Sequence, residues 1–421
     1  MWIKLACSAL LWCLTPAMAQ TSGAARDSTD QARRENAIRQ YAGLQPPEGP
    51  AEQLMLARRR DILWMIEHHP DAQVLGEPCA TIYPSGRVLS DPEGFAEARK
   101  LWLRITAPRV PIGVVTNAAV FFLTTDPPRA RELLARVWLR RRESPMQVAR
   151  AYATAISPGI AHTRQGAPDA IVDWSLSRDC LAQLLNAEDA ALIGMAATAL
   201  WQPRPPTVPS VITAPSMPET ELLRTAERLL LRAEELLPNS ADLRYQLAQL
   251  YGLQVIGTGR SASLREMQFA QLAAAQSLGG DPLRSQKDYM NAAVETGRLD
   301  IAAGSARACL DRVARQQSKA PGDDLHQCNL VLGRVALRRG KIRTAGRFLV
   351  AAGRTSGSPV LGSFGPNMML AQELLQVGRR KPVLRYLSLC SRFWKYHSKT
   401  DEWAAAMRAG KIPDFGGNLF F

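Results

Sequence analysis

The chain has 421 residues, of which 46% are hydrophobic and only 6% aromatic, and its formal net charge at pH 7 is +14. This length and apolar content suffice for two domains or one elongated array, and the low aromatic content favours helices over sheets. Beyond the N-terminal segment, no apolar run approaches the about 20 residues that cross a bilayer as a helix, so we do not expect an integral membrane protein.

The N-terminal segment has the pattern of a secretory signal. A short basic start is followed by an apolar run over residues 5–14, by Pro16, and by the small-x-small sequence Ala-Met-Ala at 17–19. We therefore interpret residues 1–19 as a cleaved signal peptide and expect an exported protein, either periplasmic or extracellular. An uncleaved anchor or a buried first helix is the alternative.

The positive charge bears on the kind of partner. Removal of Lys4 with the signal lowers the net charge from +14 to +13. Basic chains often bind nucleic acid, but an exported protein rarely meets it, so we expect no nucleic-acid partner. Anionic lipid, acidic glycan or an acidic protein suits the compartment better. The arginine triplets at 58–60 and 140–142 are more typical of solvated helix faces than of binding sites.

Proline and glycine breaks divide the chain. Residues 46–50 read Pro-Pro-Glu-Gly-Pro, and six prolines lie between Pro203 and Pro218, where a helix cannot continue. The second break is either a linker between two helical lobes or an extended strap lying across them. We predict a flexible N-terminal arm with one short helix at 20–50, an N-terminal helical lobe at 51–202, the Pro-rich segment at 203–218, a repeat lobe at 219–395, and a capping helix and tail at 396–421.

Within the lobes, a pattern of seven positions recurs. In its clearest copy, Leu332 and Gly333 form a large-small pair, Gly340 ends the first helix, and the second helix follows with residues spaced by 4 and 3. The small residue lets two helices pack closely, and glycine adopts the left-handed conformation at a helix C-terminus. The copies are Leu332, Gly333, Ala336, Gly340, Ala345, Leu349 and Ala352; Leu370, Ala371, Leu374, Gly378, Val383, Leu387 and Cys390; Tyr289, Met290, Ala293, Gly297, Ala302, Ala306 and Cys309; and, without the glycine, Asn117, Ala118, Phe121, Ala130, Leu134 and Val137.

This pattern resembles the tetratricopeptide repeat, a helix-turn-helix unit of about 34 residues. The resemblance covers roughly residues 100–160 and 219–395, and it implies an all-α protein of stacked antiparallel helix hairpins, an α-solenoid. The turn glycines at 297, 340 and 378 are 43 and 38 residues apart, which departs from the family's spacing. Longer loops, such as residues 316–323 and 355–366, absorb the difference.

The C-terminal part also resembles an uncharacterised group of bacterial exported repeat proteins. The resemblance is carried by His326 to Asn329, Gly357 to Pro359, Ser363 to Asn367, Cys390 and Phe393-Trp394, with Asn117 to Ala119 and Asp126 in the first lobe. This resemblance supports the fold and implies no activity.

Five cysteines remain after residue 19, an odd and sparse set that does not form a disulfide framework. Cys309 and Cys328 lie on either side of a predicted helix-helix turn. They are either bridged or packed separately as small buried hydrophobes. Both alternatives stay open at this point.

No motif indicates an enzyme, a metal site or a cofactor. None of the five histidines forms a pair at i, i+4 with a glutamate, and no CxxC or Gly-x-Ser-x-Gly occurs. The glycine-rich stretch at 257–261 lacks the Lys-Ser/Thr ending of a phosphate loop. The loop at 362–367 either holds an anion with its backbone N–H groups or makes a tight turn with Phe364 buried. The C-terminal aromatic residues are expected to tuck onto the last hairpin.

The repeat pattern predicts instead a binding groove. In stacked hairpins the first helices line the inner face, and side chains turned away from the second helix point into it. Four of these are cations, which would suit carboxylates because arginine binds them through two hydrogen bonds; an ordinary solvated basic face is the alternative. The predicted groove residues are Tyr245, Gln249, Arg284, Lys287, Asn291, Arg334, Arg338 and Gln372.

We therefore expect a non-catalytic binding scaffold of the cell envelope that recognises a protein or peptide, such as an acidic C-terminus. The first alternative is a basic protein that docks on anionic lipid or acidic glycan at the envelope surface. The second is an enzyme whose site the sequence does not reveal.

Overall fold

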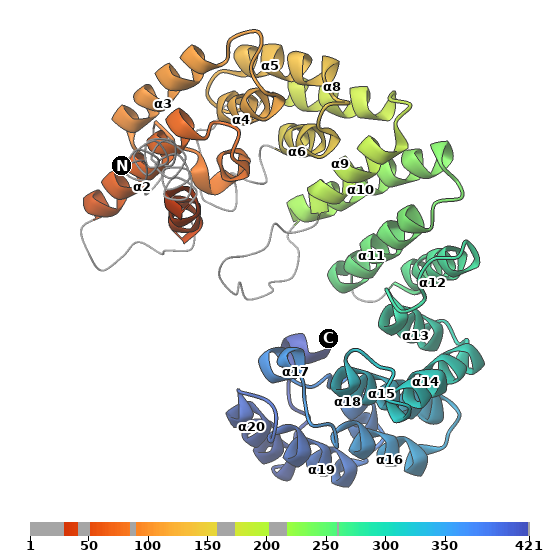
Figure 1. Cartoon of the computed structure of the whole chain (residues 1–421). Coiled ribbons are helices and arrows are strands. Elements are labelled where there is room, and N and C mark those ends of the chain that lie inside the picture. The colour runs from red at the N-terminus through yellow and green to blue at the C-terminus, as the bar shows by residue number, and fades with distance from the viewer. Residues whose placement is uncertain are drawn as a thin grey trace, which may run out of the picture. The chain divides into compact units, whose positions relative to one another are not determined.

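The computed structural model describes residues 29–40, 51–84, 90–157, 173–201, 217–258 and 261–419 (Figure 1). Every regular element in these ranges is a helix and none is a strand, which confirms the all-α prediction. None of the described helices is both long and apolar enough to cross a membrane. The predicted signal peptide, residues 203–216 of the Pro-rich segment and the last two phenylalanines lie outside the described residues.

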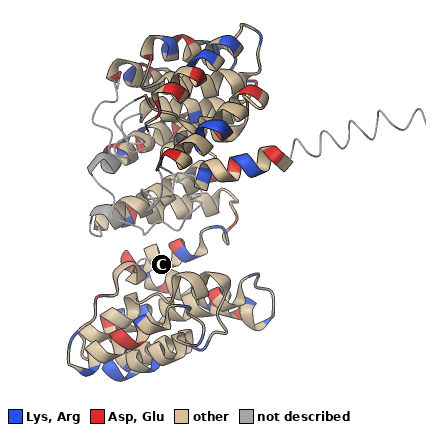
Figure 2. Ribbon diagram, turned by 90° about the vertical axis from the view of Figure 1, so that its left-hand side faces the viewer, with Lys and Arg blue, Asp and Glu red and all other residues tan. Residues whose placement is uncertain are grey.

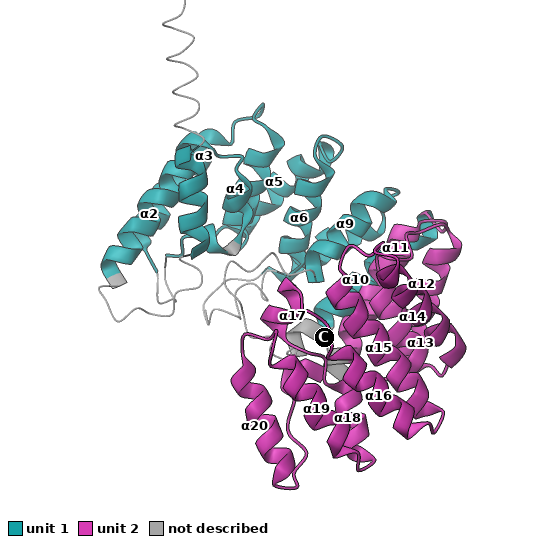
Figure 3. Cartoon of the chain, turned by 60° about the horizontal axis from the view of Figure 1, so that its bottom comes forward, with its two compact units in different colours: residues 1–211, 217–236 teal, residues 212–216, 237–421 magenta. Residues whose placement is uncertain are grey.

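The chain divides into two compact units (Figure 3). Unit 1 comprises residues 1–211 and 217–236, and unit 2 comprises residues 212–216 and 237–421. The last helix of unit 1, α10 (Met217–Leu236), packs against α9 (Ala190–Trp201) through Ala226, Leu230 and other fully buried residues. The sequence pattern predicts that residues 219–236 belong to the second lobe, whereas the structure groups them with the first unit.

Unit 1 begins with the helix at 29–40, which is anchored to the rest of the unit. Ile38 is fully buried, Arg34 forms an ion pair with Asp61, and Nη2 of Arg39 lies 3.2 Å from Oε1 of Glu77. The described part of the predicted flexible arm is therefore held in place. The reason is a pair of tertiary ion pairs that the sequence pattern does not reveal.

The remaining helices of unit 1 start where the sequence supplies capping residues. The side chains of Asp91, Asp126 and Asp173 accept hydrogen bonds from backbone N–H groups at the starts of α3, α5 and α8, which satisfies donors that a helix leaves unpaired. The elements are α2 (Ala51–His68), η1 (Gln73–Gly76), η2 (Pro78–Ala80), α3 (Pro92–Ile105), α4 (Ile112–Phe122), α5 (Pro127–Leu139), α6 (Pro145–Ile156), α8 (Trp174–Leu185), α9 and α10.

In unit 2, helices adjacent in the chain pack against one another. α11 contacts α12, α13 contacts α14, α15 contacts α16 and α18 contacts α19; in addition α13 contacts α15, α15 contacts α18, and α16 contacts α19. The elements are α11 (Ala241–Thr258), α12 (Ala262–Ser277), α13 (Gln286–Glu295), α14 (Leu299–Ala314), α15 (Pro321–Arg338), α16 (Ile342–Ala352), α17 (Pro359–Phe364), α18 (Met369–Gln376), α19 (Arg380–Cys390), α20 (His397–Arg408) and η3 (Gly416–Leu419).

Three first helices of unit 2 end in the way that the sequence predicts. Gly297, Gly340 and Gly378 have φ values of 75°, 71° and 76°, the left-handed region that glycine adopts most easily. At each one, the glycine N–H and the next N–H bond back to carbonyls in the last turn, as with Gly340 to Leu337 and Lys341 to Ala336. This pair of bonds ends a helix at its C-terminal carbonyls, so the predicted turns are confirmed.

The recurring small residues lie where helices approach each other most closely. Ala345, Leu349 and Ala352 of α16 are fully buried. The side chains at the equivalent positions of α14 and α19 are at most 1% exposed. A Cβ atom on Gly333 would collide with the Leu370 side chain of α18. The glycine of the large-small pair therefore permits contact between α15 and α18.

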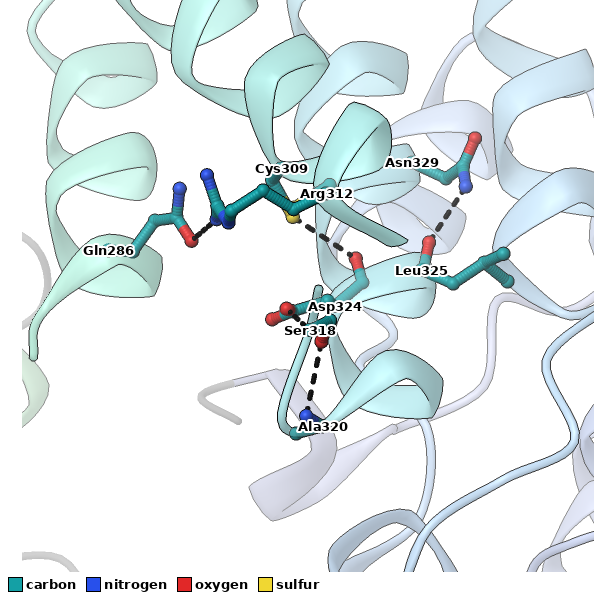
Figure 4. Close-up of a disulfide and its surroundings, with 9 residues drawn as sticks. Gln286, Cys309, Arg312, Ser318, Ala320, Asp324, Leu325 and Asn329 are labelled. Atoms are coloured by element: carbon teal, nitrogen blue, oxygen red, sulfur yellow. Dashed lines mark hydrogen bonds between the residues drawn. A yellow bond between two sulfur atoms is a disulfide. The ribbon is translucent and has the colours of Figure 1, made fainter. Parts of the chain in front are cut away.

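A disulfide joins Cys309 at the end of α14 to Cys328 in α15, with the two Cα atoms 6.5 Å apart (Figure 4). It decides between the two alternatives left open by the sequence. Cys180 and Cys390 are buried free thiols, and Cys79 is partly buried. Burial raises the pKa of Cys79 and of Cys180 to about 12, so neither is a thiolate near neutral pH.

Candidate functional site

The predicted groove residues come from the first helices of the helix pairs in unit 2. Tyr245 and Gln249 lie on α11, Lys287 and Asn291 on α13, Arg334 and Arg338 on α15, and Gln372 on α18, while Arg284 lies just before α13. Because α15 packs against both α13 and α18, these positions occupy neighbouring helices. Their side chains differ in exposure and in partners.

Tyr245 and Arg284 connect α11 to the start of α13. Tyr245 is only 2% exposed, and its hydroxyl donates a hydrogen bond of 2.6 Å to the backbone oxygen of Asp281. The Arg284 guanidinium lies 4.9 Å from the centre of the Tyr245 ring and forms an ion pair with Asp242. Tyr245 is therefore a buried contact between helices, and Arg284 already has an anionic partner.

Arg334 lies in a buried ion-pair cluster that spans three helices. It is 2% exposed, and its Nη2 atom is 2.6 Å from Oε1 of Glu295 on α13 and 2.9 Å from Oε1 of Glu373 on α18. Burial alone would lower the pKa of Arg334, but the two carboxylates raise it. Arg338, which is half exposed, lies 3.0 Å from the same Glu373 oxygen.

The expected row of free cations is therefore not formed. Arg284, Arg334 and Arg338 are paired with carboxylates, and Arg334 is buried. Residues of both charges are interspersed along the helices of each unit (Figure 2). The seven-position pattern does not single out Glu295 and Glu373, although each lies 39 residues from Arg334, close to the length of one repeat. This spacing of about one repeat is the sequence signal that could have predicted the two ion pairs.

Lys287 differs from the three arginines. Its side chain is exposed and forms no hydrogen bond or ion pair within the described part of the chain. Nearby protein nevertheless desolvates it and lowers its pKa, an effect that Asp288 and Asp323 oppose. Gln249, Asn291 and Gln372 are half-buried and thus partly accessible. The accessible part of the predicted face consists of Lys287 and these amides, bordered by paired arginines.

The residues that carry the C-terminal resemblance meet around His326. His326 Nδ1 lies 3.1 Å from the Ala352 carbonyl, and its Nε2 lies 3.3 Å from the Asn367 N–H. The Tyr386 hydroxyl donates a 2.8 Å hydrogen bond to the Asn367 carbonyl. Neutral histidine with its proton on Nδ1 satisfies both contacts, and burial lowers the pKa of His326 to about 4.

This arrangement has the features of a structural centre and not of a reactive one. His326 and Tyr386 are 2% and 0% exposed, and their polar atoms contact one another and the backbone of Ala352 and Asn367. Across the described ranges, no group of three histidine, cysteine, aspartate or glutamate residues could hold a metal ion. The network holds the 355–367 segment against α15 and α19.

The glycine-rich loop at 362–367 does not hold an anion through free N–H groups. The Gly365 and Asn367 N–H groups donate to the Leu361 carbonyl and to His326, and Asn418 donates to the carbonyls of Phe364 and Pro366. Phe364 is 53% exposed, so the expected burial of its ring is wrong. The tail also contacts the end of this loop through its backbone, because the Met368 N–H donates a hydrogen bond of 2.8 Å to the carbonyl of Asn418 in η3.

The described part of the C-terminal tail packs as expected. Phe415 is 2% exposed and meets the Trp403 ring edge-on, with the ring centres 5.1 Å apart. Trp403 donates a hydrogen bond from Nε1 to the Asp414 carbonyl. Residues 397–419 therefore cover the end of the unit 2 core.

Comparison with protein-family models and with curated proteins finds no match to this chain. The functional assignment therefore depends on the geometry of the residues themselves.

Proposed function

We propose that the protein is a non-catalytic binding scaffold of the cell envelope, built as a tetratricopeptide-repeat-like α-solenoid, and that the first-helix face of unit 2 recognises a protein or peptide segment. The contacts of α15 with α13 and α18, and of α16 with α19, support stacking of first helices on first helices and second helices on second helices. The three left-handed glycine turns support repeated hairpins.

The single observation that carries the binding proposal is the state of Lys287. It is an exposed, partly desolvated cation that makes no hydrogen bond or ion pair with any described residue, whereas Arg284, Arg334 and Arg338 on the same face are paired. A carboxylate would compensate the desolvation and form a charge-assisted hydrogen bond. The half-buried amides of Asn291 and Gln372 offer donors and acceptors to a peptide backbone.

The paired arginines contribute by holding the face rigid. Arg334 connects α13, α15 and α18, and Arg284 connects α11 to α13. A face whose helices are already fixed loses less conformational entropy when it binds an extended segment. An acidic C-terminus placed with its carboxylate at Lys287 fits this arrangement.

Export is supported by the disulfide between Cys309 and Cys328, because structural disulfides persist mainly in oxidising compartments. The N-terminal pattern of residues 1–19 supports the same location. We therefore propose that the scaffold is exported to the periplasm or to the outside of the cell.

Site-specific photocrosslinking in intact cells tests this function. A photoreactive residue at position 372 should crosslink to a defined partner, and Lys287→Glu should reduce that crosslink at least tenfold. Lys381→Glu is the matched control, because Lys381 is an exposed cation on the second helix α19, and it should leave the crosslink intact. Equal losses in both variants would instead indicate docking on an anionic surface through net charge.

A further inference from the structure

Unit 1 contains a cavity that the proposed binding face of unit 2 does not use. Its volume is about 70 Å³, and it lies between η1, α4 and α6. Its lining combines the apolar side chains of Val120 and Ala151 and the backbone of Gly76 with polar side chains, namely those of Gln73, Glu77, Thr116, Asn117, Gln147 and Arg150.

One wall of the cavity is fixed by the hydrogen bonds of the Asn117 side chain. Both amide hydrogens of Asn117 are engaged, because Nδ2 donates hydrogen bonds of 2.9 Å to the backbone oxygens of Pro70 and Ala72. A Cβ atom on Gly76 would lie 2.8 Å from Asn117 Oδ1. Asn117 therefore holds η1 against α4, and the glycine allows the close approach. This buried side chain positions the cavity and has no amide hydrogen left for a ligand.

The donors left for a ligand are on α6 and η1. Arg150 and Gln147 lie three residues apart on α6, so they share one face of that helix, and both are half-buried. Neither side chain, nor that of Gln73, makes a hydrogen bond or ion pair with any described residue. A half-buried guanidinium without a partner has lost hydration without compensation.

The charges around the cavity favour a monoanion over a dianion. Arg39 is shared by Glu77, whose Oε1 is 3.2 Å from its Nη2, and by Glu35, whose Oε2 is 3.4 Å from its Nη1. These three groups together carry one negative charge, and the positive charge of Arg150 brings the local sum to zero. A doubly charged phosphate would lie close to the Glu77 carboxylate with only one free cation to balance it. A carboxylate matches both the charge and the planar, two-pronged geometry of a guanidinium.

The size of the cavity limits what enters it. A volume of 70 Å³ corresponds to about two water molecules at liquid density. It admits a carboxylate group with one or two carbons, and a larger ligand has to extend out of the opening. The source is therefore either a small carboxylic acid or the terminal carboxylate of a chain.

We propose that this cavity is a carboxylate-binding site in which Arg150 forms the ion pair and Gln147 and Gln73 donate hydrogen bonds. It is independent of the unit 2 face, because it shares no residue with that face. Val120 also lines the cavity, and its methyl groups provide a local reporter of occupancy.

The test is methyl NMR spectroscopy of the chain from residue 20 to residue 421, at constant ionic strength. The probes are acetate, N-acetyl-trialanine with a free C-terminus, and the same peptide with an amidated C-terminus. The Val120 methyl signals are assigned by their disappearance in Val120→Ile. We expect acetate or the peptide with a free C-terminus to shift these signals in a saturable way, and the amidated peptide to leave them unchanged. A peptide affinity at least tenfold above that of acetate identifies a chain terminus as the source, and the reverse identifies a small acid.

Arg150→Gln should weaken binding at least tenfold while the methyl signals of Leu229 and Leu230, which are buried in α10 of the same unit, stay in place. Unchanged signals there show that unit 1 of the variant is folded. Arg142→Gln is the matched control, because Arg142 is exposed and does not line the cavity, and it should bind like the wild type. Equal shifts with the amidated peptide, unchanged binding in Arg150→Gln, or no saturation with either carboxylate would overturn the proposal.

Discussion

Oε1 of Glu373 on α18 lies 2.9 Å from Nη2 of Arg334 on α15, and the arginine is 2% exposed. The same Nη2 atom reaches Glu295 on α13 at 2.6 Å. One buried guanidinium thus connects three first helices of unit 2. The sequence pattern predicts Arg334 as a groove residue, whereas the structure buries it and pairs it with these two carboxylates.

Removal of this guanidinium should strongly destabilise unit 2. In Arg334→Gln, the largely buried Glu295 and Glu373 lose the buried cation that they share, and the half-exposed Arg338 stays beside Glu373. We expect a loss of about 3 kcal/mol in the free energy of unfolding. Arg338→Gln, which removes a half-exposed partner of the same Glu373, should cost less than about 1 kcal/mol. Urea denaturation followed by circular dichroism measures both. Similar losses in the two variants would contradict the structural role of Arg334.

The stability of unit 2 should depend on pH through His326. Burial lowers its folded-state pKa to about 4, below the 6.5 of an unperturbed histidine, so between these values the unfolded chain binds the extra proton. The contribution of neutral His326 to the free energy of unfolding is therefore complete above pH 6.5. It is lost as the pH falls toward 4, which lowers the free energy of unfolding by about 3 kcal/mol. Urea midpoints of wild type and His326→Gln across pH 4 to 7 measure it. The variant should show a shallower pH slope, and parallel slopes would refute the assignment.

The disulfide should stabilise the contact between α14 and α15. It closes a loop of 19 residues in the unfolded chain, and we expect its removal in Cys309→Ala with Cys328→Ala to cost about 3 kcal/mol. A reductant should lower the urea midpoint of the wild type toward that of the double variant and leave the variant itself unchanged. Thiol titration of denatured residues 20–421 should find three thiols before reduction and five after it. Five thiols in the protein isolated from an oxidising compartment would contradict the bridge.

Two glycines with positive φ should differ in their tolerance of alanine. Gly365 has φ 88° and ψ −175°, and a Cβ atom there would collide with the Trp394 ring. Gly365→Ala should therefore cost about 3 kcal/mol or more. Gly340 has φ 71° and nothing within 4 Å of its Cβ direction, so Gly340→Ala should cost only about 1 kcal/mol of backbone strain. Thermal or urea unfolding of both variants measures the two losses of stability. A larger loss in Gly340→Ala than in Gly365→Ala would contradict this prediction.

Much of the helical framework could be predicted because its signals are local. The turn glycines at 297, 340 and 378 lie at a fixed distance from a large-small pair, and a helix end depends on residues within one turn of it. The same holds for the buried stripes of α14, α16 and α19, whose 4 and 3 spacing places them on one helix face. The grouping of α10 with unit 1 had no such signal, because it depends on which helix its buried face contacts.

The candidate site was predicted only in part for the same reason. The repeat pattern alone determined which positions lie on the first helices of unit 2, because helical periodicity and capping act over a few residues. Tertiary structure decided which of those side chains are available: it buries Tyr245 and Arg334, pairs Arg284 with Asp242, and leaves Lys287 exposed. The physical reason is that ion pairing and burial depend on partners about one repeat away, and no local pattern records whether two such residues meet.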